Sequence, residues 1–263
     1  MNAIERKLVS QLTELREKFC LIGVKAEFEA EGVQMEDMIR IREVTLRAGV
    51  HLVLKVGGCE AVTDIRNGYI LGVDELVVPV TESPFAVQKF VSAVERVYTK
   101  AEMDDVKILV NIETVDGVQN FEKMLALPEF KDIYGVVVGR NDMAASYGVP
   151  EAVDEKVFEA CAFLSQKLKA LYPDKPLVLG GGFSVKTINF LKRFAPGAIN
   201  GCESKKVIYD VAILSKGIVE EAFQKGIEFQ KTWYESRVDY YERIVRDNKH
   251  FYDEQIKSLQ GWK

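Results

Sequence analysis

The feature that most constrains how this chain can fold is the alternation of short, β-branched runs with amphipathic segments. Between the β-branched runs, apolar residues recur at the three- and four-residue spacings of a helix that buries one face. Strands that alternate with helices in this way pair in parallel. The pattern therefore predicts an α/β fold on a parallel sheet, with seven strands at 20–28, 51–56, 75–80, 107–113, 134–139, 176–181 and 198–203.

Several of these runs are apolar on both faces, as a barrel or a doubly wound sheet requires. No G-x-G-x-x-G follows the first run, and the glycines at 180–182 lack that spacing, so a dinucleotide-binding fold has little support. We expect a TIM-type (β/α) barrel, which a chain of 263 residues can complete. A helical pattern at 2–18 occupies the place of a first strand, so that strand is expected to be irregular or missing.

Beyond about residue 205 the sequence shows no strand pattern, only a long, aromatic-rich helical one. We therefore expect residues 1–204 to form the barrel and residues 205–263 to form a C-terminal helical extension. That extension packs either on its own barrel or against a second subunit, and the sequence leaves both open. Its apolar face carries Phe223, Ile227, Tyr234, Val238, Tyr241 and Val245.

Composition narrows the classes of partner. The net charge of −5, without a basic stripe, argues against a nucleic acid partner. No apolar run approaches the roughly 20 residues of a membrane helix, and the charged N-terminus lacks a signal-peptide core. The four cysteines are scattered and have neither zinc nor disulfide spacing. We expect a cytoplasmic protein with reduced thiols.

Two carboxylates stand at the ends of consecutive predicted strands. Glu113 ends the run 107–113, and Asp142 follows the run 134–139. Because TIM-barrel chemistry lies at the carboxyl ends of the strands, the two are expected to be neighbours on the rim. Adjacent oxygen donors, completed by water and substrate, suit Mg²⁺ or Mn²⁺, and the lack of His and Cys argues against zinc. The alternative is that each carboxylate only caps the helix that follows it.

Further charged residues lie near the ends of the first two runs. Lys25, Glu27 and Glu29 alternate along the chain and so share one face of a strand. Lys55 closes the second run, where a cation could bind an anionic substrate. Glu60 lies just beyond and either faces the substrate or stabilises the first turn of a helix.

Residues 110–148 read VNIETVDGVQNFEKMLALPEFKDIYGVVVGRNDMAASYG. This stretch closely resembles the HpcH/HpaI aldolase and citrate lyase β-subunit family, which reads I-E-T-x-x-G-V-x-N and then G-x-x-D-L-A-A-S-x-G, and weaker likeness extends over about 20–205. The resemblance implies a barrel of the pyruvate/phosphoenolpyruvate superfamily, with Glu113 and Asp142 as ligands of a divalent metal. It also implies a 2-keto acid bound on that metal, a metal-stabilised enolate, and a trimer or hexamer whose C-terminal helices are exchanged.

The sequence departs from the family where protons are transferred. Aldolases of the family carry D-x-E-H at the strand matching 20–28, whereas this chain reads EFEA at 27–30, with Ala30 in place of the histidine. Lys55 replaces the arginine of the family's V-R-V, which keeps the charge but loses the bidentate fork. We therefore expect Glu29, Lys55 or a metal-bound water to act in proton transfer. The residues expected to bind substrate are Lys55, Glu60, Gly139 and Arg140.

These features predict a metal-dependent carbon–carbon lyase or a condensing enzyme. Its substrate would be pyruvate, phosphoenolpyruvate or a related keto acid, with an aldehyde or acyl group as the acceptor. One alternative is a Schiff-base aldolase that uses Lys25 or Lys55. Another is a non-catalytic keto-acid-binding or assembly protein on a degenerate barrel. Retention of both metal positions counts against each alternative.

Overall fold

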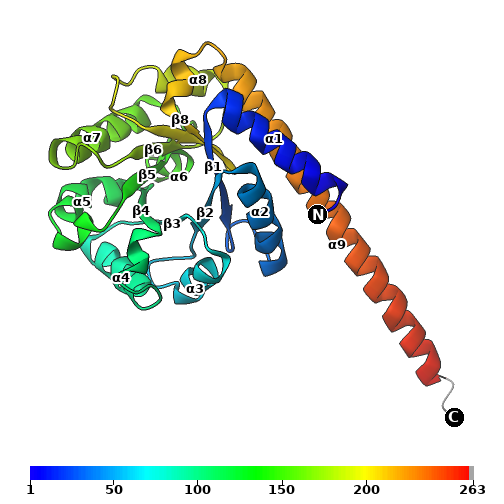
Figure 1. Cartoon of the computed structure of the whole chain (residues 1–263). Coiled ribbons are helices and arrows are strands. Elements are labelled where there is room, and N and C mark those ends of the chain that lie inside the picture. Colours follow the sequence, from blue (N-terminus) through cyan, green and yellow to red (C-terminus); the bar gives the residue numbers. More distant parts are fainter. Residues whose placement is uncertain (261–263) are drawn as a thin grey trace.

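Eight strands close a barrel in the order β1 to β8 in the computed structural model, which describes residues 1–260 (Figure 1). Each of the seven predicted runs contains one strand, so the strand pattern and the TIM-type barrel are confirmed. The strands are β1 Leu21–Glu27, β2 His51–Lys55, β3 Glu75–Val78, β4 Lys107–Ile112, β5 Gly135–Gly139, β6 Leu177–Gly180, β7 Gly201–Glu203 and β8 Val207–Asp210.

Helices cover the outside of the barrel, as the amphipathic segments predicted. Ser83 and Pro84 show how the sequence sets a boundary: the Ser83 hydroxyl accepts a hydrogen bond from the Ala86 N–H, and the proline occupies the first turn. The helices are α1 Ala3–Phe19, α2 Met35–Ala48, α3 Val62–Leu71, α4 Pro84–Glu95, α5 Val115–Leu125, α6 Arg140–Ser146, α7 Glu155–Leu171, α8 Val185–Leu191 and α9 Val219–Gln260.

The irregular strand of the barrel is the last one. β1 to β7 pair in parallel, whereas β8 is antiparallel to both β7 and β1. Only residues 204–206 join β7 to β8, and a parallel crossover needs about a dozen residues, so the chain must turn back as a hairpin. The prediction of no strand beyond residue 205 was therefore wrong. The first strand, expected to be irregular or missing, is present as β1, and its one irregularity is a shift of register between Leu21 and Gly23 where it pairs with β8.

The barrel interior is divided into an apolar layer and a polar mouth. A separate cluster inside the barrel consists of Val53, Val77, Leu109, Val137, Val178 and Ile208. Side chains alternate along a strand, so the interior position two residues nearer the carboxyl end falls at the mouth. In β2 that residue is Lys55, and in β4 it is Asn111. The apolar layer thus lies directly beneath the polar side chains of the mouth.

The helix α9 is 42 residues long and runs beside α1 before it projects beyond the barrel (Figure 1). Its first turns pack on the barrel, where the rings of Phe223 and Phe183 stack with centroids 3.7 Å apart. Farther along, Tyr234, Val238 and Val245 are exposed. The predicted apolar face is therefore split between packing on its own barrel and exposure to solvent. Within residues 1–260, every helix falls short of the length or apolar character that a membrane span requires.

Candidate active site

A cavity of about 270 Å³ lies at the carboxyl ends of the strands, where the sequence placed the site. This is below the roughly 300–1,000 Å³ of pockets for drug-sized ligands, so the space suits a small organic acid. Charged and polar side chains dominate its wall and come from strands on all sides of the barrel. They include Lys25, Glu27, Glu31, Lys55, Asn111, Glu113, Arg140, Asp142 and Glu203.

Glu113 is the most constrained carboxylate of this wall, with 2% of the residue exposed. The Val80 N–H donates to its Oε1 at 2.9 Å, and the Asn111 amide donates to its Oε2 at 2.7 Å. Burial raises the pKa of Glu113; Lys55 and the Val80 N–H oppose that rise, and the neighbouring Asp142 adds to it. The two carboxylates thus lie close enough to repel, which a cation between them would relieve.

The donor set at this point fits Mg²⁺ or Mn²⁺, which prefer oxygen ligands. Asn111 leaves its Oδ1 buried without a hydrogen-bond partner among the described residues, close beside Glu113. The lack of a side chain at Gly139 leaves space for the Glu113 carboxylate, because a Cβ at position 139 would lie 2.4 Å from Glu113 Oε2. Residues 1–260 contain no group of three or more His, Cys, Asp or Glu that could hold a metal. Water and substrate would therefore complete the coordination that Glu113 and Asp142 begin.

The backbone that serves Glu113 adopts an uncommon conformation. Val80 lies in the loop between β3 and α4 with φ of 48°, in the left-handed region that β-branched residues rarely adopt. Its N–H is the donor that fixes Glu113 Oε1. Strain of this kind persists where the surrounding structure imposes it, often at a functional site.

The two lysines predicted at the site, Lys25 and Lys55, differ in how closely carboxylates pair with them. Lys25 Nζ lies 2.7 Å from Glu203 Oε1; burial alone would lower the pKa of Lys25, but the carboxylates of Glu203, Glu27 and Glu31 together outweigh burial, and the pKa is raised. Lys55 Nζ lies 3.6 Å from Glu27 Oε2 and 4.0 Å from Glu113 Oε1. Both distances exceed a hydrogen bond, so Lys55 is the more available cation for an anionic ligand.

The structure does not bring Glu29 and Glu60 into the cavity wall. Glu29 is exposed in the turn after β1, beside Gly57. Glu60 is exposed and accepts a hydrogen bond from Lys89 Nζ at 2.9 Å, which lowers the pKa of Glu60. The roles expected for these two residues stay predictions without support from their positions.

Arg140 is almost fully buried, with 1% of the residue exposed, and its contacts brace the rim. Its Nε donates to the Gly180 carbonyl at 2.8 Å, and its Nη1 donates to the Ala152 carbonyl at 3.4 Å. The guanidinium also lies over the Phe190 ring, 5.0 Å from the centroid. These contacts tie the first residue of α6 to the end of β6, to the loop before α7 and to α8, and substrate binding by Arg140 stays a prediction.

Sequence reasoning did not place Asn111, Glu203 or Glu31 in the site, although all three line its wall. Asn111 shares a strand face with Glu113, a signal that the two-residue spacing offered. Glu203 is the last residue of β7 and binds Lys25. Glu31 lies in the loop after β1, where no periodicity predicts which way a side chain points.

The sequence profile of the HpcH/HpaI aldolase/citrate lyase family matches residues 34–170, more than half of the chain. The chain belongs to this family. The resemblance inferred from residues 110–148 is therefore confirmed. Membership supports a lyase-type enzyme, and enzymes of the HpcH/HpaI family generally depend on a divalent metal.

Several solved structures have the same fold as this chain although their sequences are only distantly similar to it. An HpcH/HpaI aldolase from Desulfitobacterium hafniense DCB-2 has a TM-score of 0.61 at 14% identity, over 88% of this chain and 90% of that one. The citrate synthase SbnG has a TM-score of 0.56 at 12% identity, over 84% and 89%. Macrophomate synthase has a TM-score of 0.55 at 16% identity, over 86% and 90%. No curated protein matches the chain.

Proposed function

We propose that the protein is a divalent-metal-dependent carbon–carbon lyase, or a condensing enzyme, that acts on pyruvate, phosphoenolpyruvate or a related 2-keto acid through its enolate. The observation that carries the proposal is the pairing of Glu113 and Asp142 in the mouth cavity. Family membership supports the lyase or condensing chemistry. The names of the structural neighbours include both an aldolase and synthases, so the proposal covers both directions of reaction.

Each residue of the proposed site has a distinct task. Glu113 and Asp142 would hold Mg²⁺ or Mn²⁺, which supplies a Lewis acid for the negative charge of the enolate oxygen. Asn111 and the Val80 N–H keep the Glu113 carboxylate in one orientation. Lys55 would bind the carboxylate of the keto acid, because its own carboxylate neighbours lie beyond hydrogen-bond distance. An aldehyde or acyl group would be the second reactant.

The contacts of the lysines count against the Schiff-base alternative. A lysine nucleophile must lose its proton, whereas the Glu203 carboxylate favours the charged form of Lys25. For Lys55, the alternative leaves the Glu113 and Asp142 carboxylates without a task. Borohydride reduction in the presence of pyruvate tests this point by mass spectrometry: the proposal expects an unmodified chain, and a covalent adduct would contradict it.

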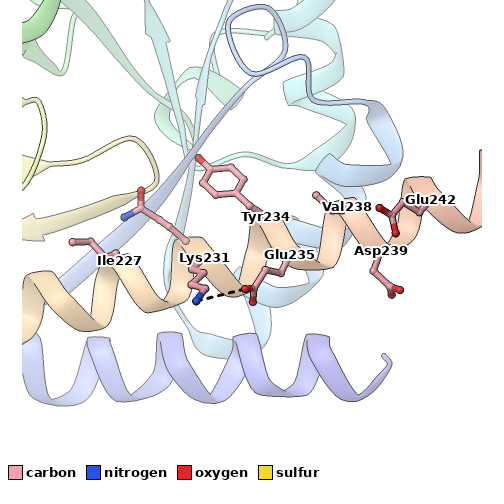
Figure 2. A pocket seen from close by; sticks show the side chains of 8 residues that line it. Ile227, Lys231, Tyr234, Glu235, Val238, Asp239 and Glu242 are labelled. Carbon is pink, nitrogen blue, oxygen red and sulfur yellow. Dashed lines mark ion pairs between the residues drawn. The ribbon is translucent and has the colours of Figure 1, made fainter.

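We also propose a cytoplasmic homo-oligomer, a trimer or hexamer, formed through α9. The projecting half of α9 exposes Val245, Phe251, Tyr252 and Ile256, more apolar surface than one helix in water normally carries. Nearer the barrel, an open hollow of about 600 Å³ runs along the helix (Figure 2). A second subunit would cover these surfaces.

The experiment that tests the proposed function is exchange of the pyruvate methyl protons with D₂O, followed by proton NMR. We expect exchange that stops when metal is stripped, returns with Mg²⁺ or Mn²⁺, and is lost in Asp142→Asn. The control is Glu122→Gln, which removes an exposed pair with Lys167 on α5 and α7. Exchange that survives metal removal would contradict the metal role, and no exchange under any condition would contradict catalysis and favour a binding protein.

A further inference from the structure

Glu31 and Lys206 form a buried ion pair at the mouth, and the proposed function does not use it. Glu31 lies in the loop after β1, and Lys206 lies in the short connection between β7 and β8. Lys206 Nζ donates to Glu31 Oε2, with 1% of the lysine side chain and 13% of the glutamate side chain exposed. Buried ion pairs seldom stabilise a fold more than apolar residues of the same size would. This pair is therefore better explained by a task than by stability.

The two oxygens of Glu31 have different surroundings. Oε2 is held by Lys206, whereas Oε1 is buried without a hydrogen-bond partner in the part of the chain that the structure describes. Glu31 also lines the cavity that Glu113 and Asp142 line. A carboxylate that has one oxygen fixed by a cation and the other without a hydrogen-bond partner, on a residue that lines a substrate-sized cavity, is arranged as an oriented base.

We propose that Glu31 is the general acid and base of the reaction, and that Lys206 is the positioning residue that holds its carboxylate. The inference rests on the proposed function and assigns the proton transfer that Ala30 leaves open. It moves the task from Glu29, which is exposed outside the cavity wall, to Glu31 two residues later.

In the cleavage direction, Glu31 Oε1 takes the proton from the hydroxyl on the carbon that leaves. The O–H electron pair becomes the new carbonyl bond, and the electron pair of the broken C–C bond passes to the enolate. Protonated Glu31 then gives the same proton to the enolate carbon, which forms the methyl group of pyruvate and restores the carboxylate. The reverse of this last transfer exchanges the methyl protons of pyruvate without a second reactant.

The charged and titratable groups that face Glu31 come from three parts of the fold. They are Lys25 and Glu27 of β1, Lys206 of the β7–β8 connection, and Tyr234 of α9. Burial raises the pKa of Glu31; Lys206 and Lys25 oppose that rise, and Glu27 adds to it. The net shift is upward, toward the pH at which a carboxylate is an effective base. Partial burial, together with the charges of Glu31 and Glu27, raises the pKa of Tyr234 to about 12, so its hydroxyl, on a half-exposed side chain that leaves α9 toward the barrel (Figure 2), stays protonated.

The test compares methyl exchange in Glu31→Gln and Glu29→Gln, with Mn²⁺ affinity measured separately by electron paramagnetic resonance. We expect Glu31→Gln to slow exchange by about 100-fold or more, the usual contribution of a general base, while Mn²⁺ affinity stays within about twofold of wild type. Glu122→Gln on the outer surface is the matched control and is expected to exchange like wild type. Normal exchange in Glu31→Gln, or loss of exchange in Glu29→Gln alone, would overturn the inference.

A second pair of variants separates chemistry from folding. Glu31→Gln leaves Lys206 buried without its partner, which destabilises a fold. The double variant Glu31→Gln/Lys206→Met removes both charges and is also expected to lose exchange, and full exchange in it would contradict the role of Glu31. Lys206→Met alone should move the acid limb of the exchange profile to higher pH, because Glu31 loses its cation. If Lys206→Met instead lowers the exchange rate equally at every pH, the positioning role of Lys206 is contradicted. If the wild-type protein itself never exchanges the methyl protons, the proposed function is contradicted.

Discussion

Gly139→Ala is the sharpest perturbation of the proposed metal site. The Ala Cβ would lie 2.4 Å from Glu113 Oε2 and 2.8 Å from Glu113 Cβ, both far inside ordinary contact. The backbone itself accepts alanine, since φ is −81° and ψ is 88° at this position. The whole effect must therefore pass through Glu113, whose carboxylate cannot stay where it is.

The magnitude follows from how Glu113 is held. Turning the carboxylate away breaks the hydrogen bonds from Val80 and Asn111, each worth about 1.5–3 kcal/mol to a charged group. Shifting the two strands apart instead costs the strain of overpacking, about 1–3 kcal/mol. The second route is the cheaper, so we expect the free energy of unfolding to fall by about 1–3 kcal/mol. Both routes displace a metal ligand, and we expect Mn²⁺ affinity to fall at least about tenfold, or about 1.4 kcal/mol.

The assays are Mn²⁺ titration followed by electron paramagnetic resonance and urea unfolding of the same preparations. Gly58→Ala is the matched control, because a Cβ at Gly58 would meet no atom within 4 Å. The control should bind Mn²⁺ and unfold like wild type. Wild-type Mn²⁺ affinity in Gly139→Ala would refute the assignment of Glu113 as a metal ligand.

Three further predictions concern strain, pH and assembly. Val80→Gly removes a left-handed strain of about 1–2 kcal/mol but adds about 0.5–1 kcal/mol of unfolded-state entropy, so urea unfolding should show a net gain of up to about 1.5 kcal/mol; a loss would contradict the strain. The Glu75 hydrogen bond raises the pKa of His51, so this pair stabilises below the unfolded pKa of about 6.5 and its contribution is lost as pH rises through the folded pKa. Solvent screens this half-exposed ion pair, so we expect it to contribute only about 0.5 kcal/mol to the free energy of unfolding. If the stability of His51→Gln depends on pH in the same way as that of wild type, the prediction is contradicted. Val238→Glu with Val245→Glu should reduce the mass measured by light scattering toward one subunit while the barrel stays folded, and an unchanged mass would contradict assembly through α9.

The barrel was largely predictable because most of its parallel strands are β-branched runs that lie between helices. β8 was not, because its four residues follow a three-residue turn and no helix separates them from β7. The sequence analysis did not predict the helix α8 for a similar reason: its seven residues are too few for the helical spacing of apolar residues to repeat. Short elements are set by the strands they join and leave a weak pattern in the sequence.

The candidate site likewise contains residues that the strand pattern predicts and residues in loops that it does not predict. Glu113 and Asp142 could be placed together because parallel strands bring their carboxyl ends to one edge of the barrel. Glu31 lies past the end of β1, in a loop whose direction no periodicity fixes. Its partner, Lys206, is 175 residues away in the sequence, so their ion pair depends on the barrel closing through β8.

A crystal structure with Mn²⁺ and pyruvate, in which anomalous scattering locates the metal, would show whether Glu113 and Asp142 hold the ion on which the keto acid binds. We expect one anomalous peak between Glu113 and Asp142, about 2.0–2.3 Å from an oxygen of each, with the keto and carboxylate oxygens of pyruvate on the same ion. A peak elsewhere, or pyruvate joined covalently to Lys25 or Lys55, would contradict it.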